Sequence, residues 1–186
     1  MRHYRHDHPE RGTLRLVIDT DELVRRNAGF AASGAQVGLP LLSTGNLRLI
    51  GCVDPRVDPS HVLGLAAGDA VVMRNVGGRV TPAALRSWAM LAKVVEARSH
   101  GRPPPGGQMV VLHHTDCGIT DLAPYPDLLA EFFEIPAASL EQKAVLDPYA
   151  SVAIDVELMR RAMPPAVRVS GLVYDVDTGL VQVVVP

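Results

Sequence analysis

The two cysteines of the chain, Cys52 and Cys117, stand in polar company that suits metal chemistry. His114 precedes Cys117 by three residues, so that on one turn both side chains can reach the same ion. Thiolate sulfur and imidazole nitrogen are ligand types that zinc prefers. The sequence offers no third cysteine to complete a closed four-ligand site. An incomplete ligand set favours the open fourth position that is typical of catalytic zinc.

Asp54 and Arg56 follow Cys52 closely and add a carboxylate and a guanidinium to this group. On an extended segment, residues two apart face the same side, so the two side chains are expected to form a charge-assisted hydrogen bond. Such a pair lowers the pKa of the carboxylate and keeps it available as an acceptor. Taken alone, this spacing would indicate only a surface ion pair, and two lone cysteines would indicate buried, inert thiols.

The segments around these residues alternate between predicted strands and predicted helices. Helices are expected to begin at Asp58-Pro59, continuing through Leu65, and at Thr81-Pro82, because each pair supplies an N-cap and a proline at the first helical position. Helical pieces follow over residues 127–161. The predicted strands are Leu47–Val53, Ala70–Asn75 and Met109–His113, with a terminal hairpin over Val167–Val185. This order predicts an α/β fold with a mostly parallel sheet flanked by helices and a C-terminal β-hairpin. Both cysteines then lie at carboxyl ends of strands, where open sheets bind ligands.

We expect one domain over residues 1–186, with a flexible arm over 1–18 and a helix over 19–33. Asp19 and Glu22 have the spacing of a capping box at the start of that helix. Histidines at positions 3, 6 and 8 belong to the arm and are interpreted as solvated. His61 and His100 are interpreted as surface residues.

The composition of the chain argues against nucleic acid and membranes as its partners. The formal net charge is -2, and 47% of residues are hydrophobic, which indicates an ordinary globular protein without a basic surface for nucleic acid. No apolar run approaches the roughly 20 residues that a membrane span needs. The charged N-terminus is not followed by an apolar stretch and does not resemble a signal peptide. These features predict a cytoplasmic protein that binds a small molecule or another copy of itself.

Several motifs resemble those of the β-class carbonic anhydrase family, in its short bacterial and archaeal form. The two signature motifs are Cys-x-Asp-x-Arg from Cys52 and His-x-x-Cys from His114, the latter followed by Gly118. The run Arg74–Gly78 resembles the Arg-Asn-Ala-Gly loop of that family, with valine at the alanine position. The ending Gly171–Gly179 is also similar. The likeness runs from about Asp21 to the C-terminus.

The resemblance implies one zinc ion per chain, held by Cys52, His114 and Cys117, and reversible hydration of carbon dioxide to bicarbonate and a proton. Asp54 would orient the attacking water while Arg56 holds Asp54, and in some members of the family the aspartate instead occupies the fourth zinc position. The backbone N–H of Gly118 would lie near the substrate oxygen.

The His-x-x-Cys spacing of the family selects its histidine ligand and excludes the rival His113. Asp116 is interpreted as a residue that caps its loop. The resemblance also implies a homodimer or larger assembly in which the N-terminal helix lies across a neighbouring chain.

Two alternatives to carbon dioxide hydration remain at this point. Enzymes that hydrolyse carbonyl sulfide or carbon disulfide have similar metal motifs, and their substrates also present a linear electrophilic carbon. A non-catalytic zinc protein would use Cys52 and Cys117 as a redox-sensing thiol switch. The presence of Asp54 and Arg56 argues against the sensor, because a thiol switch needs neither residue.

Overall fold

The computed structural model describes residues 18–101 and 106–186. The chain divides into two compact units, residues 1–38 and residues 39–186. Most of the expected N-terminal arm, including its three histidines, lies outside the described residues. The assignment of the whole chain to one domain stays a prediction.

The first unit contains helix α1 (Thr20–Ala32), at the place where the capping signal predicted it. Asp19 caps the helix, because its Oδ1 accepts a hydrogen bond from the backbone N–H of Glu22 at 2.9 Å. The expected return bond of a capping box is replaced, since the Glu22 carboxylate binds Arg25 and Arg26 on the next turn. None of the helix residues is buried within this unit.

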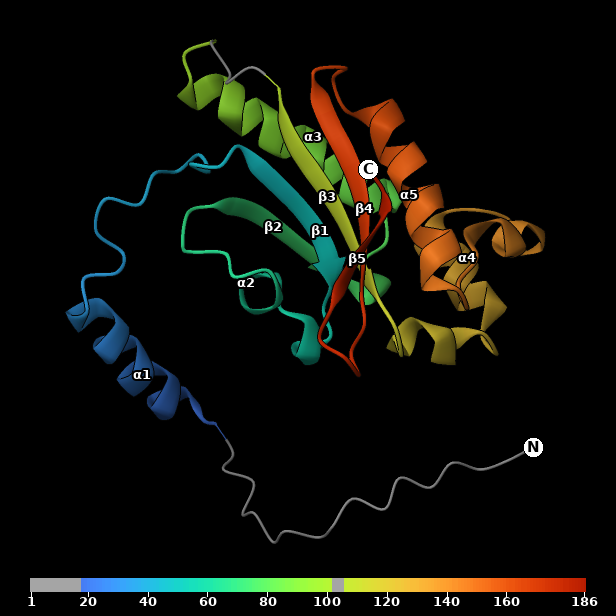
Figure 1. Ribbon diagram of the computed structural model, residues 1–186, viewed down its shortest axis with the longest axis horizontal. Helices are drawn as coiled ribbons and strands as arrows, with labels where there is room; N and C mark the ends of the chain where they lie inside the picture. Colours follow the sequence, from blue (N-terminus) through green and yellow to red (C-terminus); the bar gives the residue numbers. More distant parts are fainter. Residues whose placement is uncertain (1–17, 102–105) are drawn as a thin grey trace, which may run out of the picture. The chain divides into compact units, whose positions relative to one another are not determined.

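The second unit is built on a five-stranded sheet whose order is β2-β1-β3-β4-β5 (Figure 1). The first four strands are parallel, and β5 pairs with β4 in the antiparallel sense. The predicted α/β fold with a C-terminal hairpin is therefore confirmed. The strands are β1 (Leu47–Cys52), β2 (Ala70–Asn75), β3 (Gly107–His114), β4 (Val167–Tyr174) and β5 (Val181–Val185).

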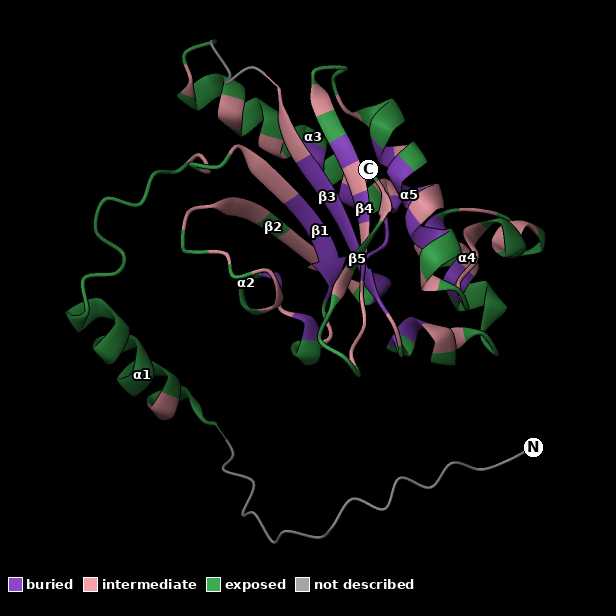
Figure 2. Ribbon diagram, viewed as in Figure 1, coloured by how far each residue is buried: buried purple, intermediate pink, exposed green. Residues whose placement is uncertain are grey.

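Helices α3 (Pro82–Arg98) and α5 (Pro148–Ala162) cover one face of the sheet. Trp88 from α3 and Val156 from α5 share a buried cluster with strand residues such as Ile50. The alternate strand residues face the other way and pack near the short helix α2 (Pro59–Val62). Figure 2 shows the buried residues concentrated in the central strands β1 and β3. Burial on both faces explains why these strands read as nearly continuous apolar runs.

The helix starts follow the predicted capping rule. The Asp58 side chain accepts from the N–H of Ser60 at the start of α2, and Thr81 Oγ1 accepts from the N–H of Ala84 at the start of α3. However, α2 ends at Val62, before the expected Leu65, because the chain turns at Gly64 with a positive φ of 64°. A glycine in this conformation commonly terminates a helix.

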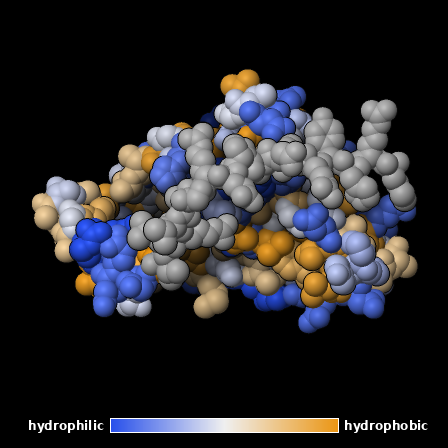
Figure 3. Space-filling view, turned by 90° about the horizontal axis from the view of Figure 1, so that it is seen from below, coloured by the Kyte–Doolittle hydropathy of each residue, from blue (hydrophilic) through white to orange (hydrophobic). Residues whose placement is uncertain are grey.

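The remaining segments either lie at the carboxyl edge of the sheet or come later in the chain than the strand ends that form this edge. They are the 3₁₀ segments η1 (Pro55–Val57), η2 (Val76–Gly78), η3 (Gly118–Leu122) and η4 (Ala137–Lys143), and helix α4 (Pro126–Phe133). Figure 3 views the molecule from this edge and shows hydrophobic residues exposed between hydrophilic ones. Val53 and Val76, which directly follow the paired ends of β1 and β2, are among the exposed apolar residues. Over the described residues, no helix has the length and apolar character needed to cross a membrane.

Candidate metal centre

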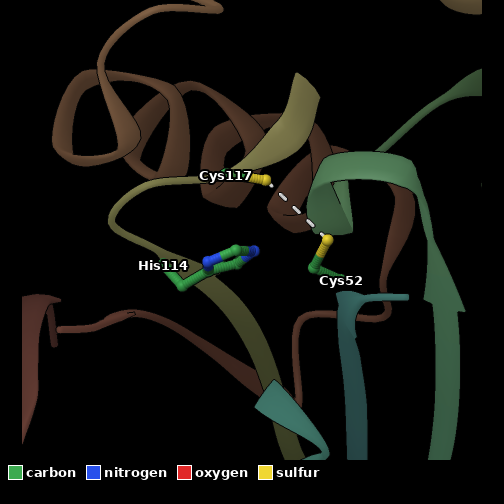
Figure 4. A group of neighbouring side chains, drawn as sticks. All are labelled: Cys52, His114 and Cys117. Carbon is green, nitrogen blue, oxygen red and sulfur yellow. Dashed lines mark hydrogen bonds between the residues drawn. The ribbon is translucent and has the colours of Figure 1, made fainter. Parts of the chain in front are cut away.

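The parallel sheet brings the three predicted ligands together from two neighbouring strands. Cys52 is the last residue of β1 and His114 the last residue of β3, while Cys117 begins the turn that leads into η3. Their ligand atoms all lie within 4.8 Å of one another, and all three residues are buried. Figure 4 shows the imidazole ring beside the two sulfur atoms, which lie 3.8 Å apart. Residues 65 positions apart in sequence therefore form one cluster of soft donors.

The hydrogen bonding of His114 leaves one ring nitrogen ready for a ligand bond. Its Nδ1 lies 2.8 Å from the carbonyl oxygen of Thr115. A carbonyl only accepts, so Nδ1 carries the proton and Nε2 has a free lone pair. Nε2 is buried and has no hydrogen-bond partner among the described residues. A buried acceptor without a donor is costly, and a metal ion between Nε2 and the two sulfurs would satisfy it.

The two thiols have opposite proton affinities. The pKa of Cys52 is lowered to about 4, chiefly because the Cys117 thiol donates a hydrogen bond to it, with further help from the backbone N–H groups of Asp54 and Gly77. The same hydrogen bond, together with burial, raises the pKa of Cys117 above its usual value. Binding of a divalent cation between the two sulfurs would displace their thiol protons. The donor set fits zinc.

A glycine turn after β2 packs against the strand that carries Cys52. Gly78 has a φ of 65°, and a Cβ added there would lie 2.9 Å from the backbone nitrogen of Cys52 and from the carbonyl oxygen of Leu112. Asn75 closes this turn, because its side chain accepts from the N–H of Arg79 and donates to the Arg79 carbonyl, both at 2.7 Å. The Asn-x-Gly-Gly part of the motif therefore seats the turn against the ends of β1 and β3.

Arg74 fixes the backbone on which Cys52 and Asp54 lie. Its Nε donates to the carbonyl of Cys52 and its Nη2 to the carbonyl of Asp54, both at 2.7 Å, while its Nη1 pairs with Asp58 at 2.9 Å. The sequence identified Arg74 only as part of a motif. Its contacts were missed because they run between strands and loops that are distant in sequence.

Asp54 and Arg56 form the expected ion pair, although on a different backbone. The segment is a 3₁₀ turn rather than extended chain, because Asp54 caps η1 by accepting from the N–H of Arg56 at 2.9 Å. Within this turn, Arg56 Nη2 reaches Asp54 Oδ2 at 2.7 Å and Nε lies near both carboxylate oxygens. The hydrogen bonds from the Arg56 guanidinium hold the pKa of Asp54 at about 2, against the effect of burial. The carboxylate is therefore ionised throughout the neutral range.

Asp116 binds Arg56 and not its own loop, which corrects the expected capping role. Its Oδ2 accepts from Arg56 Nη1 at 2.7 Å, and its carbonyl accepts from Arg56 Nη2 at 2.8 Å. Arg56 thus connects the segment after Cys52 to the segment between His114 and Cys117. No local pattern marks this second carboxylate as a partner of Arg56, since 60 residues separate the two.

The structure separates His113 from the ligands, although the two histidines are adjacent in sequence. His113 Nδ1 lies 2.9 Å from Ser151 Oγ on α5, on the helix-covered side of the sheet. Gly118 is exposed, and a Cβ added to it would meet no atom within 4 Å, so space is open beside its backbone. Its contact with a substrate remains a prediction. His61 and His100 are exposed, as expected.

A cavity of about 280 Å³ adjoins the cluster and is lined by His114, Cys117, Gly77 and Ile119, among others. A larger hollow of about 680 Å³ lies elsewhere, between α3 and the C-terminal end of α5, and contains none of the three candidate ligands. Of these two cavities, the smaller one is therefore the candidate substrate pocket of the cluster.

Fold and cluster together define an α/β protein with a candidate Cys-His-Cys metal centre at the carboxyl edge of a parallel sheet. The family model for carbonic anhydrase matches residues 47–131, which include all three candidate ligands. The solved carbonic anhydrase from Streptococcus mutans is 31% identical, with a TM-score of 0.64, and the match covers 88% of this chain and 96% of that one. The chain belongs to the β-carbonic anhydrase family.

The curated relatives of this chain are named for two different reactions. β-Carbonic anhydrase 1 of Mycobacterium tuberculosis is 33% identical over 100 residues, which are 54% of this chain and 55% of that protein. The chain thus spans about half the length of the first curated relatives that it matches. A carbon disulfide hydrolase from an Acidianus strain is 27% identical over 168 residues, covering 76% of this chain and 77% of that protein.

Proposed function

We propose that the chain is a zinc-dependent carbonic anhydrase that hydrates carbon dioxide reversibly to bicarbonate and a proton. One observation carries this proposal. Cys52, His114 and Cys117 converge within 4.8 Å, with a free Nε2 lone pair among them, and the ionised Asp54 lies two residues from the first ligand. Membership in the carbonic anhydrase family supports the same reaction.

The ligand set favours zinc with one open position. Two thiolates and one imidazole suit this ion, and the described residues group no fourth His, Cys, Asp or Glu with them. When bound, zinc supplies Lewis acidity that makes water nucleophilic near neutral pH.

Asp54 serves as the acceptor that orients the attacking water. Its carboxylate is ionised, and the Arg56 guanidinium donates to both carboxylate oxygens. Arg56 Nε is shared between the two oxygens at 3.1 and 3.2 Å, and Oδ1 also accepts from the backbone N–H of Arg56. Oδ2, whose one short partner is Nη2, is therefore the oxygen left to accept from water. Water held there adds its oxygen to the carbon of carbon dioxide: one C–O bond forms, one C=O π bond breaks with its electron pair moving to the substrate oxygen, and the water releases one proton to solvent. The Gly118 N–H, beside open space, is the proposed donor to the substrate oxygen.

The surroundings suit an uncharged substrate. Val53 and Val76 are exposed apolar residues next to the ends of β1 and β2, and Ile119 lines the adjoining cavity. These apolar residues form one part of the surroundings, and polar residues such as Arg79 and Asp116 line another part of the cavity. The apolar part favours a small neutral molecule over a charged one, because it offers no compensation for lost hydration.

Hydrolysis of carbon disulfide or carbonyl sulfide is the second candidate, because the Acidianus relative aligns over 76% of this chain. The same zinc-quantified preparation can be assayed for both reactions. Carbon dioxide hydration is followed by stopped-flow proton release, and carbon disulfide hydrolysis by release of hydrogen sulfide. We expect hydration to have the larger kcat/KM. Faster hydrogen sulfide release would assign the chain to the second candidate.

We also propose that the protein works as a homodimer or larger assembly. Leu23, Val24 and Phe30 on α1 are exposed, and no residue of that helix is buried within its unit. Burying a side chain of this size contributes about 1.5–3 kcal/mol, which a neighbouring chain would supply.

A further inference from the structure

A buried ion pair lies behind the candidate metal centre and has no part in the proposed reaction. Asp155 on α5 is 0% exposed and Arg79 is 1% exposed. Arg79 Nε donates to Asp155 Oδ2 at 2.7 Å, and Arg79 Nη2 lies 3.3 Å from Oδ1. An ion pair removed from water often contributes little net stability, because desolvation offsets the attraction. A charged pair in the core therefore calls for another explanation.

One side of this pair holds the glycine turn over Cys52. Besides Arg79, Asp155 Oδ2 accepts a hydrogen bond from the backbone N–H of Val80 at 3.0 Å. Arg79 and Val80 directly follow Gly78, whose close approach to the Cys52 nitrogen leaves no room for a side chain. The Asp155 carboxylate thus anchors the end of the turn that packs on the first candidate ligand.

The other side of the pair reaches the end of β3. His113 Nε2 faces Asp155 Oδ2 at 3.4 Å, within ion-pair range of a protonated imidazole but without a hydrogen bond, while His113 Nδ1 lies 2.9 Å from Ser151 Oγ on the same helix. His113 directly precedes His114, so its attachment to α5 fixes the backbone that carries the second candidate ligand. Arg79, His113 and Ser151 also line the cavity that adjoins His114 and Cys117.

We infer that Asp155 is a positioning residue of the metal centre. From α5 it contacts the residues after Gly78, which packs on Cys52, and also His113, which precedes His114, and it thereby sets the distance between these two candidate ligands. The inference rests on the proposed function, since it assumes that these ligands bind a metal. Outer residues that orient ligands typically change metal affinity or activity by 10–100-fold when they are replaced. Asp155 remains ionised despite its burial, because His113 and Arg79 hold its pKa below the usual value.

The test is cobalt substitution, because Co²⁺ reports the geometry of its ligands through its visible and thiolate charge-transfer absorption. In Asp155→Asn, a group of the same shape has no negative charge for Arg79 and His113. We expect Co²⁺ and Zn²⁺ affinity to fall about 10–100-fold and the visible cobalt bands to shift. The matched control is Val156→Ala, which truncates a neighbouring, fully buried residue of α5 in the hydrophobic core. It should lower the melting temperature while affinity and spectrum stay unchanged.

Arg79→Lys is the second variant and decides the case if Asp155→Asn does not fold. Lysine keeps the positive charge but loses the paired Nε and Nη2 donors, so the same spectral shift is expected in weaker form. Parental metal affinity and spectrum in the folded variant would overturn the inference. If the parental protein itself shows no cobalt–thiolate absorption, the ligand set of the proposed function fails instead, and the two outcomes are distinguishable.

Discussion

A zinc ion at Cys52, His114 and Cys117 would join β1, β3 and the start of η3. Metal binding at such a site is partly folding free energy, so loss of one ligand costs both. Cys117→Ser and His114→Ala should each lose most of the zinc and melt at a lower temperature than the parent. Metal analysis and thermal unfolding measure the two effects. His61→Ala, at an exposed position, is the control and should match the parent. Full zinc occupancy in both ligand variants would refute the ligand set.

The two carboxylates that bind Arg56 offer a matched pair for testing the acceptor. Asp54→Asn should keep its zinc but lose about 10²-fold or more in hydration rate, because an amide is not an anionic acceptor. Asp116→Asn removes the charge from an equally short contact to the same guanidinium, but the Asp116 side chain is 75% exposed, so this change should affect the rate far less. Stopped-flow rates with metal analysis separate the two. Equal rates for Asp54→Asn and the parent would contradict the assigned role.

At the level of single residues, the sequence predicted what spacing and donor type determine. The ligand trio and the Asp54–Arg56 pair are each visible as short motifs. Asp116 was assigned to its own loop and Asp155 was not identified, because their partners lie 60 and 76 residues away and no local pattern marks these contacts. Tertiary contacts of this kind arise only when the sheet brings its strands together.

At the scale of elements, the glycine turn η2 requires a residue without a side chain at position 78. Gly78→Ala introduces a Cβ 2.9 Å from backbone atoms of β1 and β3, and neither strand can move without disturbing the sheet. Gly64→Ala is the control, because its φ of 64° carries the same conformational cost but no atom lies within 4 Å. The control should lose about 1–2 kcal/mol in unfolding free energy, and Gly78→Ala clearly more, together with zinc. Equal losses in urea unfolding would show that the close approach is unimportant.

Strands and helix starts were predictable because their signals are local. Asp19, Asp58 and Thr81 each cap the helix that they were expected to cap. The 3₁₀ turn at Asp54 was misinterpreted as extended chain, since the same residues tolerate both conformations and the cap decides between them. The early end of α2 has a similar origin in the turn at Gly64.

At the scale of the whole molecule, helix α1 tests whether assembly and activity depend on each other. Deleting residues 1–32 should dissociate the homodimer and abolish hydration, although the second unit keeps every candidate ligand. Deleting residues 1–17 alone retains α1 and should leave both properties intact. An obligate interface usually buries more than about 2,000 Å², so its loss should separate the chains. Light scattering measures the mass of each variant in solution. A zinc-loaded, active monomer of the shorter chain would contradict this prediction.

Hydration of carbon dioxide by metal-quantified protein tests the central claim most directly. Zinc is removed with a chelator and returned in steps while stopped-flow hydration is recorded at each step. The rate should rise in proportion to bound zinc and reach its maximum at one ion per chain, with Asp54→Asn inactive at the same occupancy. A fully zinc-loaded parental protein that hydrates carbon dioxide no faster than buffer would contradict the account.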